Sequence, residues 1–496
     1  MLTRRRFLCG LGAAAASTLL PGRAAARTAP APGGRADQAG SPFLSRPDLV
    51  PPTVEVTTPA RGTASGYVLL APFDITGKAS PGKQFGPLIV DNHGEPVWSR
   101  PVSGATAMGL RVQRYRGRPV LTWYEGQVLG PYGGQFVAVD ESYREVLRVE
   151  ARHGYRADLH EVLLTTRGTA LITIYSEITA DLSSLGGPAQ ARLVEGVIQE
   201  LELPSGRVLF EWRSSTHVPV AESFLTDVTP AGNVDYFHLN SIGVDLDGDL
   251  LVSARNTSTV YKLDRSTGRI VWRLGGKASD FTIEAAAAFA FQHDVRRHPD
   301  GTLTLFDNAT ATPPGAGSDG AGGSSRPIRL ALDMGSMTAR LAEVLQAPDP
   351  RLAFAMGNVQ QLPDGGTFVG WGTAGPFTEF GPAGDVRFDA RFGDGSVGYR
   401  AYRLNWQAQP TGTPSIAVVP GDAGTMTVYA SWNGATGVAR WEVRTGTRPD
   451  TLQPVGANSR TGFETAIIVP LAHGYATAVA LDAHGRRLGA AAPVAV

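Results

Sequence analysis

Cysteine is nearly absent from this sequence. Its 496 residues include one cysteine, Cys9, which lies in a segment with the pattern of a removable signal peptide. Without that segment the chain has no cysteine left to form a disulfide or to hold a metal ion through thiolates. We therefore expect neither feature, and no metal site, in the mature protein.

Long apolar runs are lacking as well. The run "LGAAAASTLL" near the start is too short to cross a bilayer comfortably, and no other stretch approaches that length. The preceding "TRRRFLCG" and the following "GRAAAR" predict a twin-arginine signal peptide over residues 1–26, cleaved after Ala26. We expect no transmembrane segment, and export by the twin-arginine machinery to a secreted, periplasmic or cell-envelope location.

The chain has no net charge and few helical patterns. The 45 basic residues balance 45 acidic ones, so no overall field attracts nucleic acid or an anionic membrane, and we expect neither as a partner. Only "SDFTIEAAAAFAF" (279–291) predicts a helix, and a short one. The 60 glycines and 35 prolines are typical of many short strands joined by tight turns.

A loose repeat runs through most of the sequence. A strand, a turn and a second strand recur in six copies, three of which carry Trp98, Trp212 and Trp272 in "GEPVWS", "GRVLFEWRS" and "GRIVWRLGG". Between these copies lie hairpins with an Asp-Gly turn, such as "VRRHPDGTLTLFDN" and "VQQLPDGGTFVGWG". Two alternating hairpins in roughly 50 residues are the pattern of a four-stranded propeller blade.

The repeats divide the chain into units. They predict an all-β fold with a β-propeller over residues 51–408, preceded by a flexible linker rich in Pro, Gly and Ala at 27–50. From about residue 410 the alternation of apolar and polar residues continues without the Trp-ended repeat. This change predicts a small C-terminal β-sandwich of fibronectin or immunoglobulin type over residues 409–496.

Three of the nine histidines share one setting. His160 in "RADLHEVLL", His238 in "DYFHLNSI" and His293 in "FAFQHDVRR" each come just before a predicted strand. Inner strands of a propeller begin near its central channel, so three blades would aim these imidazoles at one axis. For any single one of them, a buried structural histidine is the alternative.

Three stretches are similar to the bacterial arylsulfate sulfotransferase family, and more closely to its actinobacterial and fungal branch. They are "FHLNSI" followed by "SARN", then "FQHDVRRHPDGTLTLFDN", and "MGNVQQLPDGGTFVGWG". The likeness covers residues 60 to 405. It implies a six-bladed propeller that moves a sulfuryl group from a phenolic sulfate ester to a phenol. The family does so without the nucleotide donor PAPS and without a cofactor, through a transiently sulfated histidine.

The resemblance also assigns residues. It places the nucleophile at His293, the supporting pair at His238 and Asn240, the arginine at Arg255, and a further histidine at His160. The chemistry agrees, since a guanidinium offers a planar fork of donors to sulfuryl oxygens and a neutral imidazole is available near pH 7. A protonated His238 or His160 would stabilise the leaving phenolate.

Aromatic residues near these motifs are candidate walls for flat phenolic substrates. They are Tyr236, Phe237 and Phe291, with packing in the core as the equal alternative. Asp294 follows the predicted nucleophile, but neighbouring strand residues point to opposite faces, so we assign it no role.

Two other functions stay open at this stage. One is a secreted binding propeller without catalysis, with a carbohydrate or protein ligand; it would not need His293, His238 and Arg255 to converge. The other is a quinoprotein dehydrogenase, because "YKLDRSTGRIVWRLGG" resembles the Trp repeat of pyrroloquinoline quinone propellers. That motif packs neighbouring blades against each other and says little about a cofactor.

The sequence "DLDGD" at 245–249 lacks the further ligands of a calcium loop and predicts a hairpin turn.

Overall fold

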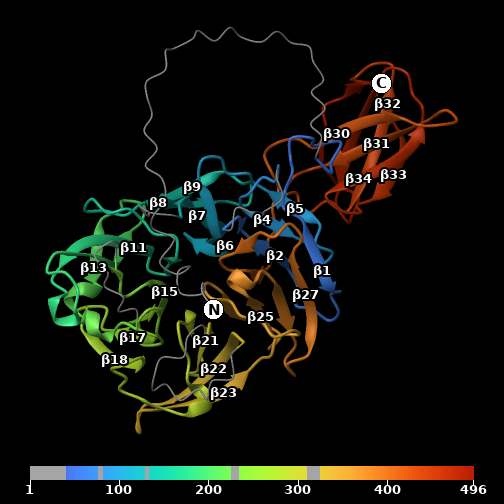
Figure 1. Cartoon of the computed structure of the whole chain (residues 1–496). Helices are drawn as coiled ribbons and strands as arrows, with labels where there is room; N and C mark the ends of the chain where they lie inside the picture. The colour runs from blue at the N-terminus through green and yellow to red at the C-terminus, as the bar shows by residue number, and fades with distance from the viewer. Residues whose placement is uncertain (1–40, 76–81, 129–132, 225–233, 310–323) are drawn as a thin grey trace, which may run out of the picture.

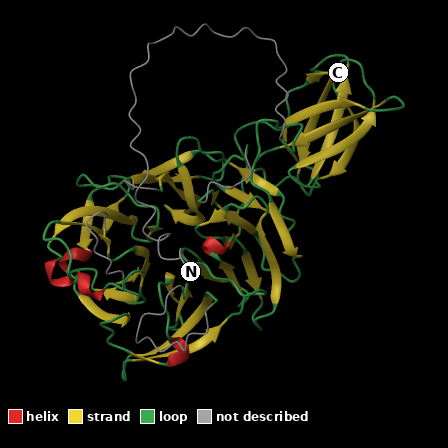
Figure 2. Ribbon diagram, viewed as in Figure 1, coloured by secondary structure: helices red, strands yellow, loops and turns green. Residues whose placement is uncertain are grey.

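The regular secondary structure of the described residues is almost entirely β-strand. The computed structural model describes residues 41–75, 82–128, 133–224, 234–309 and 324–496, so the predicted signal peptide (1–26) and residues 27–40 of the predicted linker lie outside the described residues. Figure 2 shows strands in every sheet, and the helical elements among the described residues are short 3-10 turns. These turns are η2 (Ser183–Leu185), η3 (Ser214–Thr216), η4 (Val220–Glu222), η5 (Ala285–Ala287) and η6 (Gly372–Ala374). The all-β prediction is confirmed, and the described part has no helix long and apolar enough to cross a membrane.

Six mainly antiparallel sheets follow one another in a ring (Figure 1). Sheet 1 contains β29 (Tyr402–Leu404), β2 (Tyr67–Leu70), β4 (Leu88–Val90) and β5 (Pro96–Ser99). Sheet 2 contains β6 (Thr106–Tyr115), β7 (Arg118–Gln127), β8 (Gly133–Val139) and β9 (Glu145–Val149). Sheet 3 contains β10 (Val162–Leu164), β11 (Thr169–Ala180), β12 (Ala191–Glu202) and β13 (Val208–Arg213), with β14 (Val234–Asp235) parallel to β12.

The other three sheets repeat this plan. Sheet 4 contains β15 (Leu239–Val244), β16 (Leu250–Ala254), β17 (Thr259–Leu263) and β18 (Ile270–Gly275). Sheet 5 contains β20 (His293–Arg297), β21 (Leu303–Asp307), β22 (Arg326–Asp333) and β23 (Thr338–Val344), with β19 (Thr282–Ile283) beside β23. Sheet 6 contains β24 (Asn358–Gln361), β25 (Thr367–Gly370), β26 (Phe377–Phe380) and β27 (Val386–Phe392), with β1 (Val54–Thr58) added at its edge.

The ring closes through strands from both ends of this region. Each sheet contacts the next through its inner strands, and sheet 6 contacts sheet 1, which contacts sheet 2. Within sheet 1, β29 pairs with β2 in the register Val68↔Arg403, and beside it β28 (Val397–Gly398) pairs with β3 (Pro72–Phe73). Segments far apart in the sequence therefore hold the ring together.

The tryptophans of the repeat fill the spaces between neighbouring sheets. Trp98, Trp212 and Trp272 keep at most 4% of their surface exposed. Trp212 lies in one apolar cluster with residues of sheets 3 and 4, and Trp272 in a cluster with residues of sheets 4 and 5. Burial of a large aromatic ring between two neighbouring sheets stabilises their contact, which we call a seam. This explains why the second strand of the repeat often ends in Trp.

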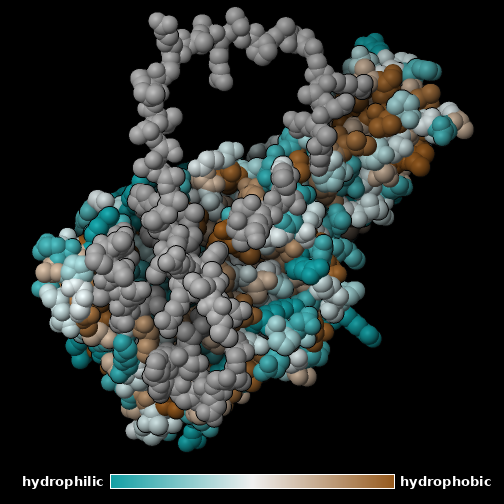
Figure 3. All heavy atoms as spheres, in the orientation of Figure 1, coloured by the Kyte–Doolittle hydropathy of each residue, from teal (hydrophilic) through white to brown (hydrophobic). Residues whose placement is uncertain are grey.

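Residues after 408 form a separate C-terminal unit with its own core. One sheet contains β30 (Ser415–Pro420), β31 (Thr425–Ser431) and β34 (Glu464–Pro470). The other contains β33 (Gln453–Ser459), β32 (Arg440–Gly446), β35 (Tyr475–Leu481), β36 (Arg487–Ala490) and β37 (Val494–Ala495). Buried residues of both sheets, including Val428, Trp441 and Val443, share one cluster. Figure 3 shows further apolar residues on the visible surface of this unit.

Two expectations about local structure differ from what is observed. Residues 41–50 were expected in a flexible linker, but Phe43 contacts Phe463 with ring centroids 4.3 Å apart, and the Ser45 N–H donates to Glu464. Residues 279–291 were expected to be helical, but form only β19 and η5. Phe281 and Phe289 are anchored in the seam between sheets 4 and 5, and these tertiary contacts override the helix propensity of the alanines.

Candidate active site

The three predicted histidines meet where inner strands of three neighbouring sheets begin. His160 precedes β10 by two residues, His238 directly precedes β15, and His293 is the first residue of β20. The ring centroids of His160 and His238 are 5.1 Å apart, and those of His238 and His293 are 6.4 Å apart. The ring of sheets therefore gathers residues from distant repeats into one site.

Two of these imidazoles are held by carboxylates. His238 Nδ1 lies 2.5 Å from Asp235 Oδ2, and the His238 main-chain N–H donates to the same carboxylate. His160 bonds to Asp158 in the same two ways, through Nδ1 and through its main-chain N–H. A carboxylate accepts a hydrogen from Nδ1, so Nε2 of each ring is the atom that can exchange a proton with a bound molecule.

The third imidazole has a neutral partner. His293 is buried, with 1% of its surface exposed, and its Nδ1 lies 2.7 Å from Asn308 Oδ1. The Asn308 amide nitrogen donates to the carbonyls of Ala353 and Met356, at 2.9 and 3.0 Å. On the other side of the ring, the Met356 main-chain N–H donates to His293 Nε2 at 3.2 Å. His293 therefore carries its hydrogen on Nδ1 and a lone pair on Nε2.

Arg255 supplies a buried cation beside the histidines. Its main-chain N–H donates to the carbonyl of His238 at 2.9 Å, and its guanidinium lies 4.8 Å from the centre of the Phe291 ring. Nη1 donates to Asn256 and Nη2 to the carbonyl of Phe354. Nε is buried and bonds to none of the described residues. A charged donor left unpaired in the interior is costly, which points to an anionic ligand at this position.

Asn240 is hydrogen-bonded to the main chain at Gln292, the residue before His293. Its side-chain amide nitrogen donates to the carbonyl of Gln292 at 2.7 Å. Its main-chain carbonyl accepts hydrogen bonds from Tyr399 Oη and Arg400 Nη2. One amide hydrogen of Asn240 is thus already in use, and its side-chain Oδ1 is buried without a hydrogen bond to any described residue.

The predicted aromatic residues do not all reach the site. Tyr236 and Phe237 are fully buried inside the sheets, where Tyr236 Oη lies 2.9 Å from Ser214 Oγ and the Phe237 ring packs against Trp212. They belong to the core, which was the alternative interpretation. Only Phe291 lies at the site, as the platform beneath the Arg255 guanidinium.

Sequence reasoning missed Tyr175, which lies beside two of the histidines. Its ring stacks on that of His160 with centroids 5.1 Å apart, and its centroid is 5.5 Å from that of His238. Tyr175 Oη lies 3.1 Å from the carbonyl oxygen of Leu239. No local motif marks Tyr175, because it reaches the site only through the pairing of β11 within sheet 3.

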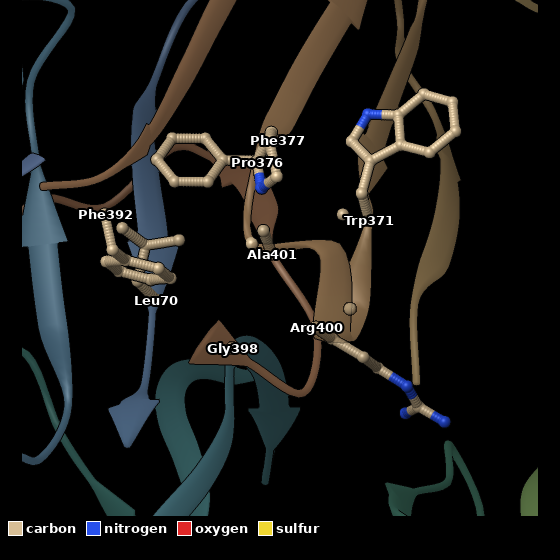
Figure 4. Close-up of a pocket in the computed structure, with 11 residues that line it drawn as sticks. Leu70, Trp371, Pro376, Phe377, Phe392, Gly398, Arg400 and Ala401 are labelled. Atoms are coloured by element: carbon tan, nitrogen blue, oxygen red, sulfur yellow. The ribbon is translucent and has the colours of Figure 1, made fainter. Parts of the chain in front are cut away.

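A layer of buried ion pairs lies next to the histidines. Glu161, which follows His160, accepts bonds from Arg296 and Arg400 and pairs with Arg111 at 2.8 Å. Burial raises the pKa of Glu161, but the three arginines more than offset this and lower it to about 2. Figure 4 shows Arg400 extending away from the apolar side chains that line a small cavity between sheets 1 and 6.

Asp294 belongs to this layer and not to the imidazole beside it. Its carboxylate pairs with Arg296 at 2.7 Å and with Arg400 at 3.3 Å. Asp294 has φ of 57°, in the left-handed region, and the pairing of β20 with β21 is irregular there. Three arginines and two carboxylates leave this layer with a net charge of +1.

Burial sets the ionisation of the site. It lowers the pKa of His293 well below the usual range, and the charge of Arg255 lowers it further. Burial also lowers the pKa of His238, against the opposing effect of Asp235. The pKa of Arg255 falls to about 10 for the same reason. Near neutral pH, His293 is therefore an uncharged imidazole beside a charged guanidinium.

Metal-binding groups do not gather in the described part of the chain, where no cluster of three His, Cys, Asp or Glu could hold an ion. At the turn 245–249, the ammonium of Lys262 lies among the carboxylates of Asp245, Asp247 and Asp249. A cation supplied by the chain thus lies among these three carboxylates, and Arg297 also pairs with Asp245.

Comparison with solved structures gives distant likenesses. A protein of unknown function from Bacteroides caccae is 15% identical with a TM-score of 0.40, over 68% of this chain and 100% of that one. A virginiamycin B lyase from Staphylococcus aureus is 9% identical with a TM-score of 0.33, over 76% and 95%. A protein from Lactobacillus plantarum is 12% identical with a TM-score of 0.35, over 82% and 100%. At these scores the likenesses carry no argument about function.

Comparison with sequences is more specific. No curated protein matches the chain. Residues 111–393, more than half of the sequence, match the family model described as arylsulfotransferase (ASST). The matched region includes His160, His238, Asn240, Arg255 and His293. The chain belongs to the arylsulfotransferase family.

Proposed function

We propose that this protein is a PAPS-independent aryl sulfotransferase that moves a sulfuryl group from a phenolic sulfate ester to a phenol through a sulfated His293. The observation that carries the proposal is the pairing of two groups in one buried site. His293 presents a lone pair on Nε2, and Arg255 beside it has a charged donor that no described residue uses. Nucleophile and anion-binding group are thus present together.

The first half of the reaction forms the covalent intermediate. Arg255 holds the sulfuryl oxygens. The lone pair of His293 Nε2 gives up its hydrogen bond from the Met356 N–H and forms a bond to sulfur. The bond between sulfur and the phenolic oxygen breaks, and its electron pair leaves with the phenolate. An imidazolium at His238 gives its proton to that oxygen; the negative substrate favours the charged form of this ring against the effect of burial.

The second half reverses these events with a new phenol. The same imidazole, now neutral, takes the proton of the incoming phenol, and the phenolic oxygen bonds to sulfur. The bond between Nε2 and sulfur breaks, and the electron pair returns to His293. His238 can take this proton because burial, by lowering its pKa, favours the neutral ring, and because Asp235 fixes the orientation of that ring. The cycle balances without a cofactor or an external base.

The convergence of His293, His238 and Arg255 favours this enzyme over a binding propeller, which has no need of it. No observation favours a quinoprotein dehydrogenase. We further propose that the six sheets are the six blades of a propeller, that residues 409–496 form a fibronectin- or immunoglobulin-like sandwich, and that the chain is exported by the twin-arginine route. We place it in the actinobacterial and fungal branch of the family.

Incubation of the mature protein with a chromogenic aryl sulfate tests the function. Phenol should accelerate release of the donor phenolate in ping-pong kinetics, and without an acceptor the mass of the chain should increase by one sulfuryl group on His293. His293→Ala should abolish release and transfer together. Sequential kinetics, with full activity in His293→Ala, would contradict the covalent route.

A further inference from the structure

We propose that Asn308 is a positioning residue that holds His293 as one uncharged tautomer and so makes Nε2 the nitrogen that takes the sulfuryl group. The proposal rests on the function above and deepens it, because it states which atom reacts and which side chain decides this. Asn308 follows the last residue of β21 and is fully buried.

The hydrogen bonds of Asn308 fix its orientation. Its amide nitrogen has two hydrogens, and these point to the carbonyls of Ala353 and Met356. An amide turned the other way would place oxygen against both carbonyls, with no hydrogen between them. Oδ1 therefore faces His293, and because a carbonyl oxygen only accepts, the hydrogen in the 2.7 Å bond belongs to His293 Nδ1.

A second contact, on the other side of the ring, agrees with this tautomer. The main-chain N–H of Met356 donates to His293 Nε2 at 3.2 Å, which requires a lone pair on that atom. Both ring nitrogens thus indicate the same protonation state. Asn308 also holds the carbonyl of Met356, so one side chain orients the imidazole and the segment that lies against it.

The three histidines differ in the charge of the group on Nδ1. His160 and His238 bond to the carboxylates of Asp158 and Asp235, whereas His293 bonds to an amide. A carboxylate stabilises the imidazolium and suits a histidine that carries protons. An amide orients the ring without that effect, which suits a nucleophile that must keep its lone pair.

The other charged groups around His293 act in the same direction. Arg255 faces it from the end of β16, His238 from the start of β15 and His160 from the start of β10, and all three disfavour a positive charge on His293. The nearest carboxylate in sequence, Asp294, is paired with Arg296 and Arg400. The amide at position 308 is neutral as well, so no group around His293 strongly stabilises its imidazolium form.

Asn308→Asp is the decisive variant, because it keeps the size of the side chain and adds the charge. We expect the acid limb of the pH profile for donor turnover to move up by about 1–3 pH units. Above that limb, part of the activity should remain. A merely structural role for Asn308 would lower activity at every pH and leave the limb in place, and that result would overturn the proposal.

Asn433→Asp is the matched control. Asn433 bonds to both the N–H and the carbonyl of Ser99, far from the histidines, so its substitution also loses an amide donor to a main-chain carbonyl. Its pH profile should coincide with that of the wild type. Asn308→Ala should keep the acid limb low and reduce turnover by about 100-fold, since the ring is then free to rotate.

Two measurements on the wild type decide the matter even if the Asn308 variants do not fold. ¹⁵N-histidine NMR, with His293→Ala for assignment, should show the His293 tautomer with hydrogen on Nδ1. The trapped adduct should be the Nε2 isomer of sulfohistidine. The Nε2–H tautomer, or sulfation at Nδ1, would overturn this proposal while leaving the proposed function intact. A wild type that takes no sulfuryl group would instead remove the proposed function.

Discussion

Arg255 shows how one side chain can be shaped for a ligand at a cost to the protein. Its Nε is a charged, buried donor without a partner among the described residues, which costs about 1–3 kcal/mol or more. The rest of the guanidinium is held by Asn256, by the carbonyl of Phe354 and by the ring of Phe291. The unused donor is therefore held rigidly in place, as recognition of an anion requires.

Arg255→Lys should separate charge from geometry. Lysine keeps the positive charge but loses the planar fork and the stacking on Phe291, so we expect kcat to fall by about 10²–10³-fold, with a smaller effect on donor binding. Steady-state kinetics with an aryl sulfate measure both effects. Arg265→Lys, at an ion pair with Glu200 away from the site, is the control and should leave kcat unchanged. Equal loss in both variants would argue against a role of Arg255 in turnover.

The ionisation of the site predicts which groups limit donor turnover at each end of the pH range. His293 must be neutral to attack, and its pKa is lowered well below the usual 6.5, so activity should persist at acidic pH where an ordinary histidine is protonated. Arg255 stays charged up to its pKa of about 10, so the alkaline limb should come at lower pH, where His238 loses the proton that it gives to the leaving phenolate. The profile of kcat/KM against pH measures both limbs. An acid limb above pH 6.5 would contradict this account.

The polar residues of the site were easier to predict than its walls. His293, His238, Asn240 and Arg255 stand in recognisable stretches of sequence. Tyr175 does not, because its place depends on how β11 and β12 of sheet 3 lie against β15, and a single sequence does not show that packing.

Asp294 shows the limits of a pattern within one strand. Alternation predicted that it points away from His293, and its carboxylate does lie elsewhere, but the backbone reaches this arrangement through a left-handed residue and an irregular pairing. His238 and Phe291 also have positive φ, at 55° and 54°. Such conformations cost of order 1–3 kcal/mol each and cluster at functional sites, where the surrounding fold imposes them.

The segment from Ala353 to Gly357 positions His293 and Arg255 through main-chain hydrogen bonds. Gly357 has φ of 104°, and a methyl group there would lie 2.5 Å from the ring of Phe306. Gly357→Ala should therefore displace Met356 and Phe354, which contact His293 and Arg255. We expect a loss of about 2–4 kcal/mol in the free energy of unfolding and a clear decrease in kcat.

Gly301→Ala isolates the backbone contribution to that effect. Gly301 also has positive φ, at 84°, but no atom lies within 4 Å of a methyl group there. This variant should lose about 1–2 kcal/mol and keep its kcat. Urea unfolding and steady-state kinetics distinguish the two glycines. Equal losses in both variants would show that the contact with Phe306 does not matter.

The repeats predicted the strand content but not every connection around the ring. Hairpins are encoded locally by Asp-Gly turns and alternating side chains, so most of sheets 1 to 6 were visible in the sequence. The alanine-rich stretch at 279–291 was misjudged because Phe281 and Phe289 gain more by filling a seam than by completing a helix. Residues 41–50 looked like a linker because their partner, the surface around Phe463, lies more than 400 residues away.

The closure of the ring and the position of the C-terminal unit lead to a prediction about truncation. A chain that ends at Ala408 keeps β28 and β29, and with them the pairing Val68↔Arg403 that joins sheet 1 across the two ends. It loses the bonds of Asn433 to Ser99 and of Tyr143 to Gly434, which hold the C-terminal unit on sheets 1 and 2. We expect a soluble, active protein with a lower Tm.

A chain that ends at Ser396 tests the same idea from the other side. It lacks β28 and β29, so β2 becomes an open edge, and it lacks Tyr399 and Arg400, which bond to the carbonyl of Asn240 behind the nucleophile. Open edges promote aggregation, and the loss of Arg400 leaves Glu161 and Asp294 with fewer partners. We expect an insoluble or inactive product. Size-exclusion chromatography and phenolate release compare the two chains; if both behave alike, the closing strands are not what holds the ring and its site together.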